Sequence, residues 1–520
     1  MSAQTDKIEA GPRSGGAEHH DNDIDLKHEA VVLKSDHDEL GLWATVCRFK
    51  KVAVLICNLI AIAAAADGYQ YKLNGNIIAN KGFVNHIGFL NAAGTKHVLN
   101  AQHTALWGAM QSLGQLVGML FLNPVSDRIG RKMTMYVLWV VLAGSLTLET
   151  LVRDWRDWSG AKILAGVGVG ALQSTLPIYI AEWSPSNIRG AMVLTYSFWN
   201  TIGKFLAPLT LLICENADPQ EYKIPIVTQW GFLGIMLPIF LWLPETAQYY
   251  AERDLDEKGR ASLDRVNGRV PGYDVDAEYA IIKNSILEQR RRRQELEQDD
   301  GSSSSRKGWR ELADSYVACF RGPNARRTLG SALPACAQQL TGLSFLSTYA
   351  SLFFRQAGFA DPFLITTVLT AIALVTSVAL MLWTDRFGRR LVVFAAACVS
   401  TATMLVVAVI GLAPTSTPLR GFCIFVACVW SFFNNALGAH GRAGGRPGAD
   451  MGYQTGWLFF GVGAVTCVVV WFFVPEPSRR NNAEMDEMYD KGVPAWKMKD
   501  YVTDVQLAQR QARGRREEVA

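Results

Sequence analysis

Eleven long apolar runs dominate the chain, and each is long enough to cross a lipid bilayer as a helix. A span needs about 20 predominantly apolar residues. A backbone in lipid must satisfy its own hydrogen bonds, which leaves helices for runs of this length and composition. The sequence therefore predicts an all-α, polytopic membrane protein. The runs lie at 52–74, 103–126, 133–152, 160–181, 191–213, 224–243, 329–354, 362–383, 391–413, 420–437 and 456–474.

Charge is concentrated outside these runs. Of the 520 residues, 49% are hydrophobic and 19% are charged, and the charged ones gather in 1–51, 244–328 and 475–520. Lys and Arg clusters before the first run and after the second, fourth, sixth and eighth runs fall on one side if the N-terminus is cytoplasmic. We expect a cytoplasmic N-terminal tail (1–51), a cytoplasmic central loop (244–328) and a cytoplasmic C-terminal tail (475–520).

The remaining bulk properties argue against several classes of protein. The net charge of +4 gives no basic face suited to nucleic acid. Most of the nine cysteines lie inside or beside apolar runs and lack metal-ligand spacing, so we expect neither a disulfide framework nor a metal site. The polar N-terminus is not a cleavable secretory signal. No nucleophile triad or phosphate loop is present, so we expect no catalytic residues, no cofactor and no enzymatic activity.

Two pairs of motifs recur in the same order along the chain. DRIGRK begins at Asp127 and DRFGRR begins at Asp385, each at the end of the second run of its half. LPET and VPEP each close the last run of a half. Paired motifs in one order indicate a duplicated bundle. We predict two pseudo-symmetric helix bundles, at 52–243 and 329–474.

The second half is shorter than the first. Asp127 and Glu245 are 118 positions apart, but Asp385 and Glu476 are only 91 apart. The shortfall matches about one membrane helix and a short loop. The glycine-rich stretch LGAHGRAGGRPGADMG (437–452) lies where they belong. The sequence therefore predicts a 6+6 bundle whose second half lacks span 11.

An odd number of spans would place the basic C-terminal tail on the wrong side of the membrane. One explanation is that 420–437 enters and returns without crossing, which would put Trp430, Asn434 and Asn435 in an irregular, partly wet segment. The other explanation, which we favour, is a deletion or an incorrect gene reading.

The motifs together resemble those of the sugar porter family of the major facilitator superfamily, in its fungal branch. The matching pieces are DRIGRK, PIYIAEWSPSNIRG, PETAQYY, QQLTG, DRFGRR and PEPSRR, within about residues 45–490. The resemblance implies a 6+6 helix fold, alternating access and a sugar site at mid-membrane between the halves. Many fungal members couple sugar to protons. We accordingly expect a monomeric, multi-pass protein of the plasma membrane whose partners are a small-molecule sugar, protons and the lipid bilayer.

The function that follows is carbohydrate:proton symport. The alternatives are a non-transporting sugar sensor on the same scaffold and an inactive, truncated transporter. Sensors tend to have long cytoplasmic tails, so the short tail of this chain favours transport.

Span 7 carries the motif QQLTGLSFLSTY. Adjacent glutamines in an apolar segment are costly unless they find partners, and an amide can both donate to and accept from sugar hydroxyls. Gln338 and Gln339 match the family's sugar-binding pair, Ser344 stands where many relatives have Asn, and Tyr349 closes the motif. The alternative is that these groups only bond to neighbouring helices.

Span 5 contains Lys204 near mid-membrane, and a charge at that depth is a functional hypothesis by default. Alignment with the family puts Ser197 and Lys204 where relatives have two sugar-binding glutamines, with Asn200 one turn before Lys204. A charged lysine cannot accept a hydrogen bond, so an acidic sugar or a carboxylate-bearing polyol becomes a candidate substrate. The alternative is a lysine paired to an internal carboxylate or reaching an aqueous cavity. Trp430 and Asn435 complete the predicted sugar-binding set.

Span 1 ends in AADGYQYKLNG. Proton-coupled relatives often have Asp two residues after the glycine, where this chain has Gln70, and the nearest carboxylate is Asp67. In relatives that Asp pairs with an Arg at the start of span 4, a position that Lys162 holds here. Both Asp67 and Lys162 are expected toward the outer ends of their spans. Our hypothesis is that they form a proton-sensitive pair; the alternative is a fixed structural ion pair.

The inner ends of the spans carry a set of charged motifs. A short glycine-containing turn lets arginines reach carboxylates and helix C-termini of neighbouring spans. Such pairs can hold one conformation and break in the other; alternatively, they only keep loops inside. The predicted gating residues are Asp127, Arg128, Gly130, Arg131, Glu182, Arg189, Glu245, Asp385, Arg386, Gly388, Arg389 and Glu476.

Overall fold

The computed structural model of the chain is helical in almost every stretch that it describes. Those stretches are residues 45, 47–49, 56–90, 97–185, 188–270, 273–299, 317, 320, 322–341, 361–387, 389–410, 417–438, 463–470, 487–489, 491–494, 497–498 and 501–504. The elements are α3 (Cys57–Ile77), α4 (Lys81–Ile87), β1 (Phe89–Leu90), β2 (His97–Val98), α5 (Ala101–Ile129), α6 (Arg131–Thr150), α7 (Trp155–Trp183), α8 (Arg189–Ala217), α9 (Lys223–Trp242), α10 (Ala247–Glu252), α11 (Asp256–Asn267), α12 (Val275–Asp299), α14 (Gly322–Gln338), α16 (Pro362–Phe387), α17 (Arg389–Ile410) and α18 (Thr417–Gly438).

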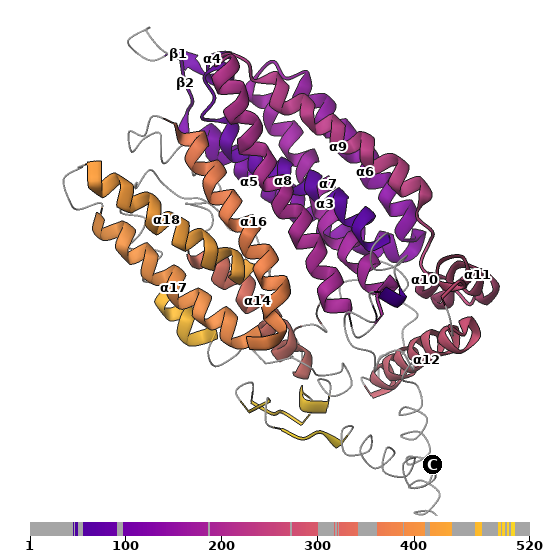
Figure 1. Ribbon diagram of the computed structural model, residues 1–520. Helices are drawn as coiled ribbons and strands as arrows, with labels where there is room; N and C mark the ends of the chain where they lie inside the picture. The colour runs from indigo at the N-terminus through magenta and orange to yellow at the C-terminus, as the bar shows by residue number, and fades with distance from the viewer. Residues whose placement is uncertain are drawn as a thin grey trace, which may run out of the picture.

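The first half is a bundle made of α3 and α5–α9 (Figure 1). In it α5 packs on α7, α3 packs on α8, and α6 packs on both α7 and α9. Its apolar core includes the fully buried side chains of Ile60, Leu73, Trp158, Leu172 and Phe240. Helices α5–α9 each give one face to this core and expose large apolar side chains on another.

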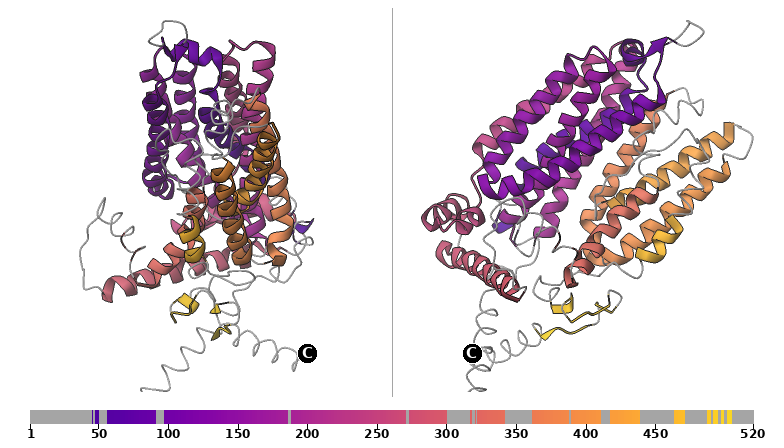
Figure 2. Two further views of the ribbon diagram at one scale, coloured as in Figure 1. Left: turned by 90° about the vertical axis from the view of Figure 1, so that its left-hand side faces the viewer. Right: turned by 180° about the vertical axis from the view of Figure 1, so that it is seen from behind.

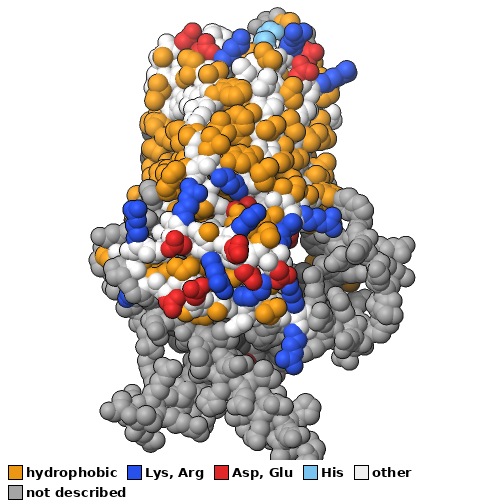
Figure 3. Space-filling view, turned by 90° about the vertical axis from the view of Figure 1, so that its right-hand side faces the viewer, with side chains coloured by type: hydrophobic (Ala, Val, Ile, Leu, Met, Phe, Trp, Pro, Cys, Tyr) orange, Lys and Arg blue, Asp and Glu red, His pale blue; other side chains and the backbone are white. Residues whose placement is uncertain are grey.

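The outward faces of the bundle are apolar as well. Val140 on α6 and Leu241 on α9 are 63% and 60% exposed. Figure 3 shows a band of apolar side chains across one face, with many Lys, Arg, Asp and Glu side chains at the end that α10–α12 occupy and others at the opposite end. An apolar band of this kind fits lipid. Following the predicted topology, we call the charged end the inner end of the bundle and the opposite end the outer end. The hairpin of β1 and β2 and the short helix α4 lie at the opposite, outer end (Figure 1).

Among the described residues, seven helices are long and apolar enough to cross a membrane. They are α5, α6, α7, α8, α9, α16 and α17. Helix α3 is 21 residues long and contains Asp67 and Lys72. It lies inside the bundle beside α8 rather than on its lipid-facing surface.

Helices α3 and α8 approach each other so closely that their backbones touch. A Cβ atom added at Gly68 would lie 1.9 Å from the carbonyl oxygen of Asn200. One added at Gly203 would lie 2.0 Å from the carbonyl oxygen of Ala65. Small residues permit such contacts between membrane helices. These two glycines therefore fix how near the first and fifth spans can come.

The described part of the second half contains α14, α16, α17, α18 and the helical residues 463–470. Helix α16 packs against α8 of the first half and against α18 of its own half, and Figure 2 shows this arrangement from two further sides. Residues 439–462, which include most of the glycine-rich stretch, lie outside the described residues. The absence of span 11 therefore remains a prediction.

Helix α18 bears on the topology of the second half. It is one continuous helix of 22 residues, and Trp430, Asn434 and Asn435 all lie within it. The irregular, returning segment that we considered for 420–437 is therefore not supported.

We expect Gly68→Ala to destabilise the folded protein by about 1–3 kcal/mol, because the added methyl group overpacks the contact with α8. The matched control is Gly231→Ala, where an added Cβ meets nothing within 4 Å and alanine's better helix propensity should make the change neutral or stabilising. The measurement is the thermal unfolding midpoint of the detergent-solubilised protein. Equal midpoints for the two variants would contradict the close approach.

Candidate functional site

Polar side chains join the two halves where α8 meets α16. The hydroxyls of Thr201 on α8 and Ser377 on α16 are 3.3 Å apart. Asn435 on α18 donates to the hydroxyl of Ser377 at 3.0 Å and to the carbonyl of Ala373 at 2.6 Å. One polar chain therefore runs from the fifth span, through the eighth, to the tenth. It contains Asn435, one of the predicted sugar-binding residues.

A second polar group lies where α14 meets α18. Gln338 donates its side-chain amide to the carbonyl of Asn434 at 3.4 Å. Asn434 in turn donates to the hydroxyl of Thr341 at 3.1 Å, and the indole of Trp430 donates to the Thr341 carbonyl at 3.0 Å. In this conformation the predicted sugar-binding residues Gln338 and Trp430 bond to a neighbouring helix. Ser344 and Tyr349 lie outside the described residues, and Gln339 is half-buried.

On the first half, the predicted residues lie along one side of α8. Ser197 is half-buried, Asn200 is buried, and Lys204 is half-buried. The ammonium of Lys204 lies 5.9 Å from the centre of the Tyr71 ring of α3. A helix places residues three and four apart on one face, so Ser197, Asn200 and Lys204 present a polar row near the α8–α16 contact.

Asp67 is buried at the middle of α3 and ties that helix to two others. One carboxylate oxygen accepts from Gln173 of α7 at 2.9 Å. The other accepts from Tyr196 at 2.9 Å and from Asn200 at 2.7 Å, both on α8. Three neutral donors therefore stabilise its charge.

The predicted pairing of Asp67 with Lys162 is wrong. The partner of Lys162 is Glu149 of α6, with 2.9 Å between the ammonium and a carboxylate oxygen and both side chains fully buried. Asp67 lies level with Gln173, which is 11 residues after Lys162 on α7, or about 16 Å along the helix axis. The two groups occupy different depths.

Side chains from two further spans bond to the Glu149–Lys162 pair. Gln70 of α3 donates to the same carboxylate oxygen as Lys162. Gln229 of α9 donates to the other oxygen at 3.3 Å. The ammonium of Lys162 also lies 4.3 Å from the centre of the Trp158 ring. Four helices therefore meet at one buried carboxylate near the outer end of the bundle. Glu149 was not among the residues predicted from the sequence, although a carboxylate inside an apolar run was a signal for it.

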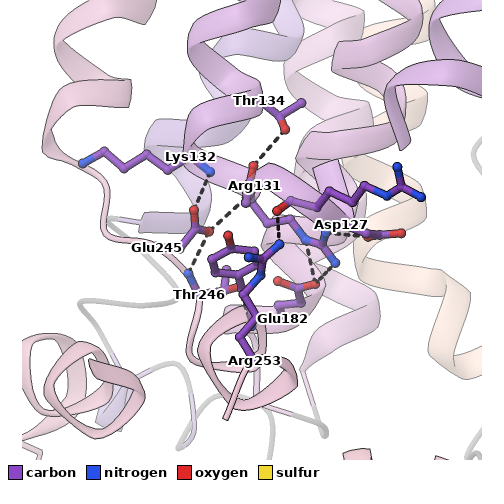
Figure 4. Close-up of polar contacts among 11 residues, drawn as sticks. Asp127, Arg131, Lys132, Thr134, Glu182, Glu245, Thr246 and Arg253 are labelled. Carbon is purple, nitrogen blue, oxygen red and sulfur yellow. Dashed lines mark hydrogen bonds and ion pairs between the residues drawn. The ribbon is translucent and has the colours of Figure 1, made fainter. Parts of the chain in front are cut away.

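The inner ends of α5, α6 and α7 meet at Arg131 (Figure 4). Its guanidinium donates to Glu182 at 3.0 and 3.2 Å and to Asp127 at 2.5 Å. Arg131 and Glu182 each have a side chain only 6% exposed. The predicted residues Asp127, Arg131 and Glu182 are thus brought together as one ion cluster.

Glu245 stabilises the turn between α5 and α6 through hydrogen bonds to its carboxylate (Figure 4). Its carboxylate accepts from the backbone amides of Arg131 at 3.1 Å and Lys132 at 3.0 Å. Burial raises the pKa of Glu245 above its ordinary value, and the three backbone hydrogen bonds that it accepts oppose that effect. Gly130 has φ of +106°, and a Cβ atom there would lie 2.6 Å from the Glu245 carboxylate. Only glycine accommodates both the backbone angle and this contact.

The other predicted gating residues are less fully described. The carbonyl of Arg128 accepts a hydrogen bond from Arg253, which follows α10, and Arg189 begins α8. In the second half, Asp385 and Arg386 end α16 and Arg389 begins α17, the same helix-end positions as in the first copy. Gly388 and Glu476 lie outside the described residues. Among the described residues, no cluster of His, Cys, Asp and Glu could hold a metal ion.

Comparison with known proteins decides the family. The model of the family described as "Sugar (and other) transporter" matches residues 56–440. The chain belongs to this family. The predicted resemblance is thereby confirmed, and the chain is a multi-pass membrane protein.

Two curated relatives illustrate the similarity. The chain is 28% identical over 372 residues to the major facilitator-type transporter ecdD of Aspergillus rugulosus, a match that spans 71% of this chain and 65% of that protein. It is 25% identical over 502 residues to the low-affinity glucose transporter HXT3 of Saccharomyces cerevisiae, covering 87% of this chain and 85% of the relative. Both relatives are named as transporters.

Solved structures confirm the predicted two-bundle fold. The proton:xylose symporter XylE bound to 6-bromo-6-deoxy-D-glucose superposes with a TM-score of 0.61 at 17% identity, covering 85% of this chain and all of that chain. XylE from E. coli in a partially occluded, inward-open conformation gives a TM-score of 0.55 at 16% identity, with 82% and 100% coverage. At this identity the likeness concerns the fold alone.

We expect Arg131→Ala to cost about 3–5 kcal/mol of stability, because it leaves the buried Glu182 carboxylate without its cation. Arg260→Ala is the matched control, since its ion pair with Asp276 is exposed at 56% and 75% and such pairs contribute about 0–1 kcal/mol. Thermal unfolding of the two purified variants checks this. A drop for Arg260→Ala as large as that for Arg131→Ala would contradict the ranking.

Proposed function

We propose that the protein transports a sugar across the plasma membrane by alternating access and couples that sugar to protons. Membership of the sugar transporter family supports the transport of a sugar. The fold that it shares with XylE, which is named a proton:xylose symporter, supports the coupling. Transport leaves the substrate chemically unchanged, so the protein is not an enzyme.

The junction of the two halves suits a sugar. The α8–α16–α18 chain and the α14–α18 group offer amides, hydroxyls and an indole that can donate to or accept from several hydroxyls of one ligand. In the conformation described, amides of this set bond to neighbouring helices instead. A bound sugar could replace these hydrogen bonds with its own. It would then favour one arrangement of the two halves over another, because a ligand shifts a conformational equilibrium only through contacts that differ between the states.

The single observation that carries proton coupling is the buried pair of Glu149 and Lys162. Two charges inside an apolar bundle stabilise each other, whereas loss of one leaves the other uncompensated at a high cost. Protonation of Glu149 would remove the negative charge and force Lys162 to find water or another partner. Because Gln70 and Gln229 bond to the same carboxylate, α3, α6, α7 and α9 would all respond. This links the binding of a proton to a change in helix packing.

Glu149 replaces Asp67 as our candidate for the proton-binding carboxylate. Asp67 accepts hydrogen bonds from Gln173, Tyr196 and Asn200, whereas Glu149 forms a salt bridge with a fully buried lysine. Asp67 instead holds α3, α7 and α8 together.

We expect Glu149→Gln to abolish proton-driven accumulation of sugar while sugar exchange continues. The amide can still bond to Lys162 but cannot bind and release a proton. The measurement is uptake into proteoliposomes with an imposed pH gradient, compared with counterflow without a gradient. Glu149→Gln should reduce accumulation to the equilibrium level, at least tenfold below wild type, and leave the counterflow rate within about threefold.

The matched control is Glu215→Gln, which removes a carboxylate paired at 3.1 Å with Lys81 at a more exposed position. It should accumulate sugar normally. Asp67→Asn separates the two carboxylates: loss of accumulation in that variant, but not in Glu149→Gln, would return the coupling role to Asp67. A properly inserted wild type with neither uptake nor counterflow would favour the sensor or the inactive, truncated transporter.

A further inference from the structure

The buried carboxylate of Glu149 can exchange protons with water only if a polar route leads to it. Its side chain and that of Lys162 are both fully buried. Toward the outer end of α7, the ring of Trp158 lies 4.3 Å from the Lys162 ammonium. The rings of Phe83 and Trp107 pack on Trp158, and all three side chains are at most 1% exposed. This aromatic side offers few hydrogen bonds to a water molecule that carries a proton.

The opposite side of the carboxylate is polar. Gln70 of α3 donates to Glu149, and Asn74 lies one turn further along the same face of α3. The side-chain amide of Asn74 donates to the side-chain oxygen of Gln111 on α5. Gln70, Asn74 and Gln111 are 5%, 9% and 5% exposed. A row of three buried amides therefore leads from Glu149 across α3 to α5.

Each amide in this row has one atom that lacks a hydrogen-bond partner among the described residues. These atoms are Oε1 of Gln70, Oδ1 of Asn74 and Nε2 of Gln111. Leaving buried polar atoms unpaired is costly, and a buried water typically makes about three hydrogen bonds to such atoms. A water can donate to the two oxygens and accept from the nitrogen.

The spacing of the two oxygens suits one bridging water. Gln70 and Asn74 are four residues apart, or about 6 Å along the axis of α3. Two hydrogen bonds of about 2.8 Å each, made by one water, span nearly the same distance. The donor of Gln111 comes to the same place because Gln111 already bonds to Asn74.

We propose that Gln70, Asn74 and Gln111 bind an internal water molecule and that protons reach and leave Glu149 through it. This inference rests on the proposed function and adds the route of the coupled proton. A hydronium ion at this position gives one proton to the carboxylate, which becomes the carboxylic acid, and a water molecule remains; the reverse step releases the proton. Gln70 lies between the water and Glu149, so its amide turns aside during the transfer. Such a route sets the speed of proton exchange and leaves its equilibrium unchanged.

The transport test separates the rate of accumulation from its final level. Gln111→Met and Asn74→Leu keep the size of each side chain but remove its hydrogen bonds. In proteoliposomes with an imposed pH gradient, we expect either variant to slow the initial rate of sugar uptake at least tenfold and to reach the wild-type level later. Counterflow, which exchanges sugar without net proton movement, should stay within about threefold of wild type. Asn74→Ser, which keeps a hydroxyl and leaves room for water, should retain the fast rate.

The matched control is Gln115→Met. Gln115 lies one turn from Gln111 on the same face of α5, but its amide donates to Gln173 at 2.5 Å. This variant should leave the initial rate within about threefold of wild type. A second measurement does not depend on transport: an experimental map of the full chain that shows ordered water should have a peak within about 3.2 Å of all three amide atoms.

Four results overturn the proposal. They are an unchanged initial rate in folded Gln111→Met and Asn74→Leu, a lower final level in these variants, an equal loss of counterflow, and a map with ordered water elsewhere but none between the amides. A wild type that exchanges sugar without accumulating it would instead refute the proton coupling of the proposed function. That result differs from slow accumulation in the variants alone.

Discussion

The cost of removing charge from water governs the arrangement of the first bundle. Helices α6 and α7 run antiparallel and are joined by an ion pair at each end, Arg131 with Glu182 at the inner end and Glu149 with Lys162 at the outer end. The polarity is reversed between the ends, since α6 gives the cation inside and the anion outside. Each buried charge needs its partner, so the two pairs together fix the register of the third and fourth spans. The packing of α5, α3 and α9 around them follows from that register.

The two pairs differ in ways that suit different roles. The inner pair is extended by Asp127 and by the Glu245 carboxylate, which accepts from the backbone amides at the start of α6. It holds together the ends of α5, α6 and α7 that lie nearest to α10–α12. The outer pair is shared with the neutral amides of Gln70 and Gln229 and with the ring of Trp158. A single proton would thus neutralise the anion of the outer pair, while the inner cluster has several carboxylates.

The sequence was sufficient for much of the fold and for part of the site. The length of the apolar runs predicted the positions of the spans, because a backbone exposed to lipid has few structures besides a helix that satisfy its hydrogen bonds. The repeated motif at Asp127 and Asp385 indicated two halves. The Asp127–Arg131–Glu182 cluster was predictable because all three lie at helix ends on one side of the membrane. The partner of Lys162 was not predictable. The carboxylate that it contacts depends on the relative axial position of the antiparallel helices α6 and α7, which loops and core packing determine. For the same reason the bonds of Gln338 to Asn434 could be anticipated only as an alternative to sugar contact.

The backbone contact between α3 and α8 has a mechanical consequence. Because Gly68 and Gly203 bring the two backbones together, no layer of flexible side chains separates these helices to absorb a shift, and close-packed interfaces resist continuous deformation. The first and fifth spans must then move as one rigid body. That body carries Gln70, which bonds to the Glu149 carboxylate, on one helix and Lys204 on the other. A displacement that begins at the outer ion pair would therefore pass through the Gln70 side chain to α3 and then, through the backbone contact, to α8 at the junction of the halves.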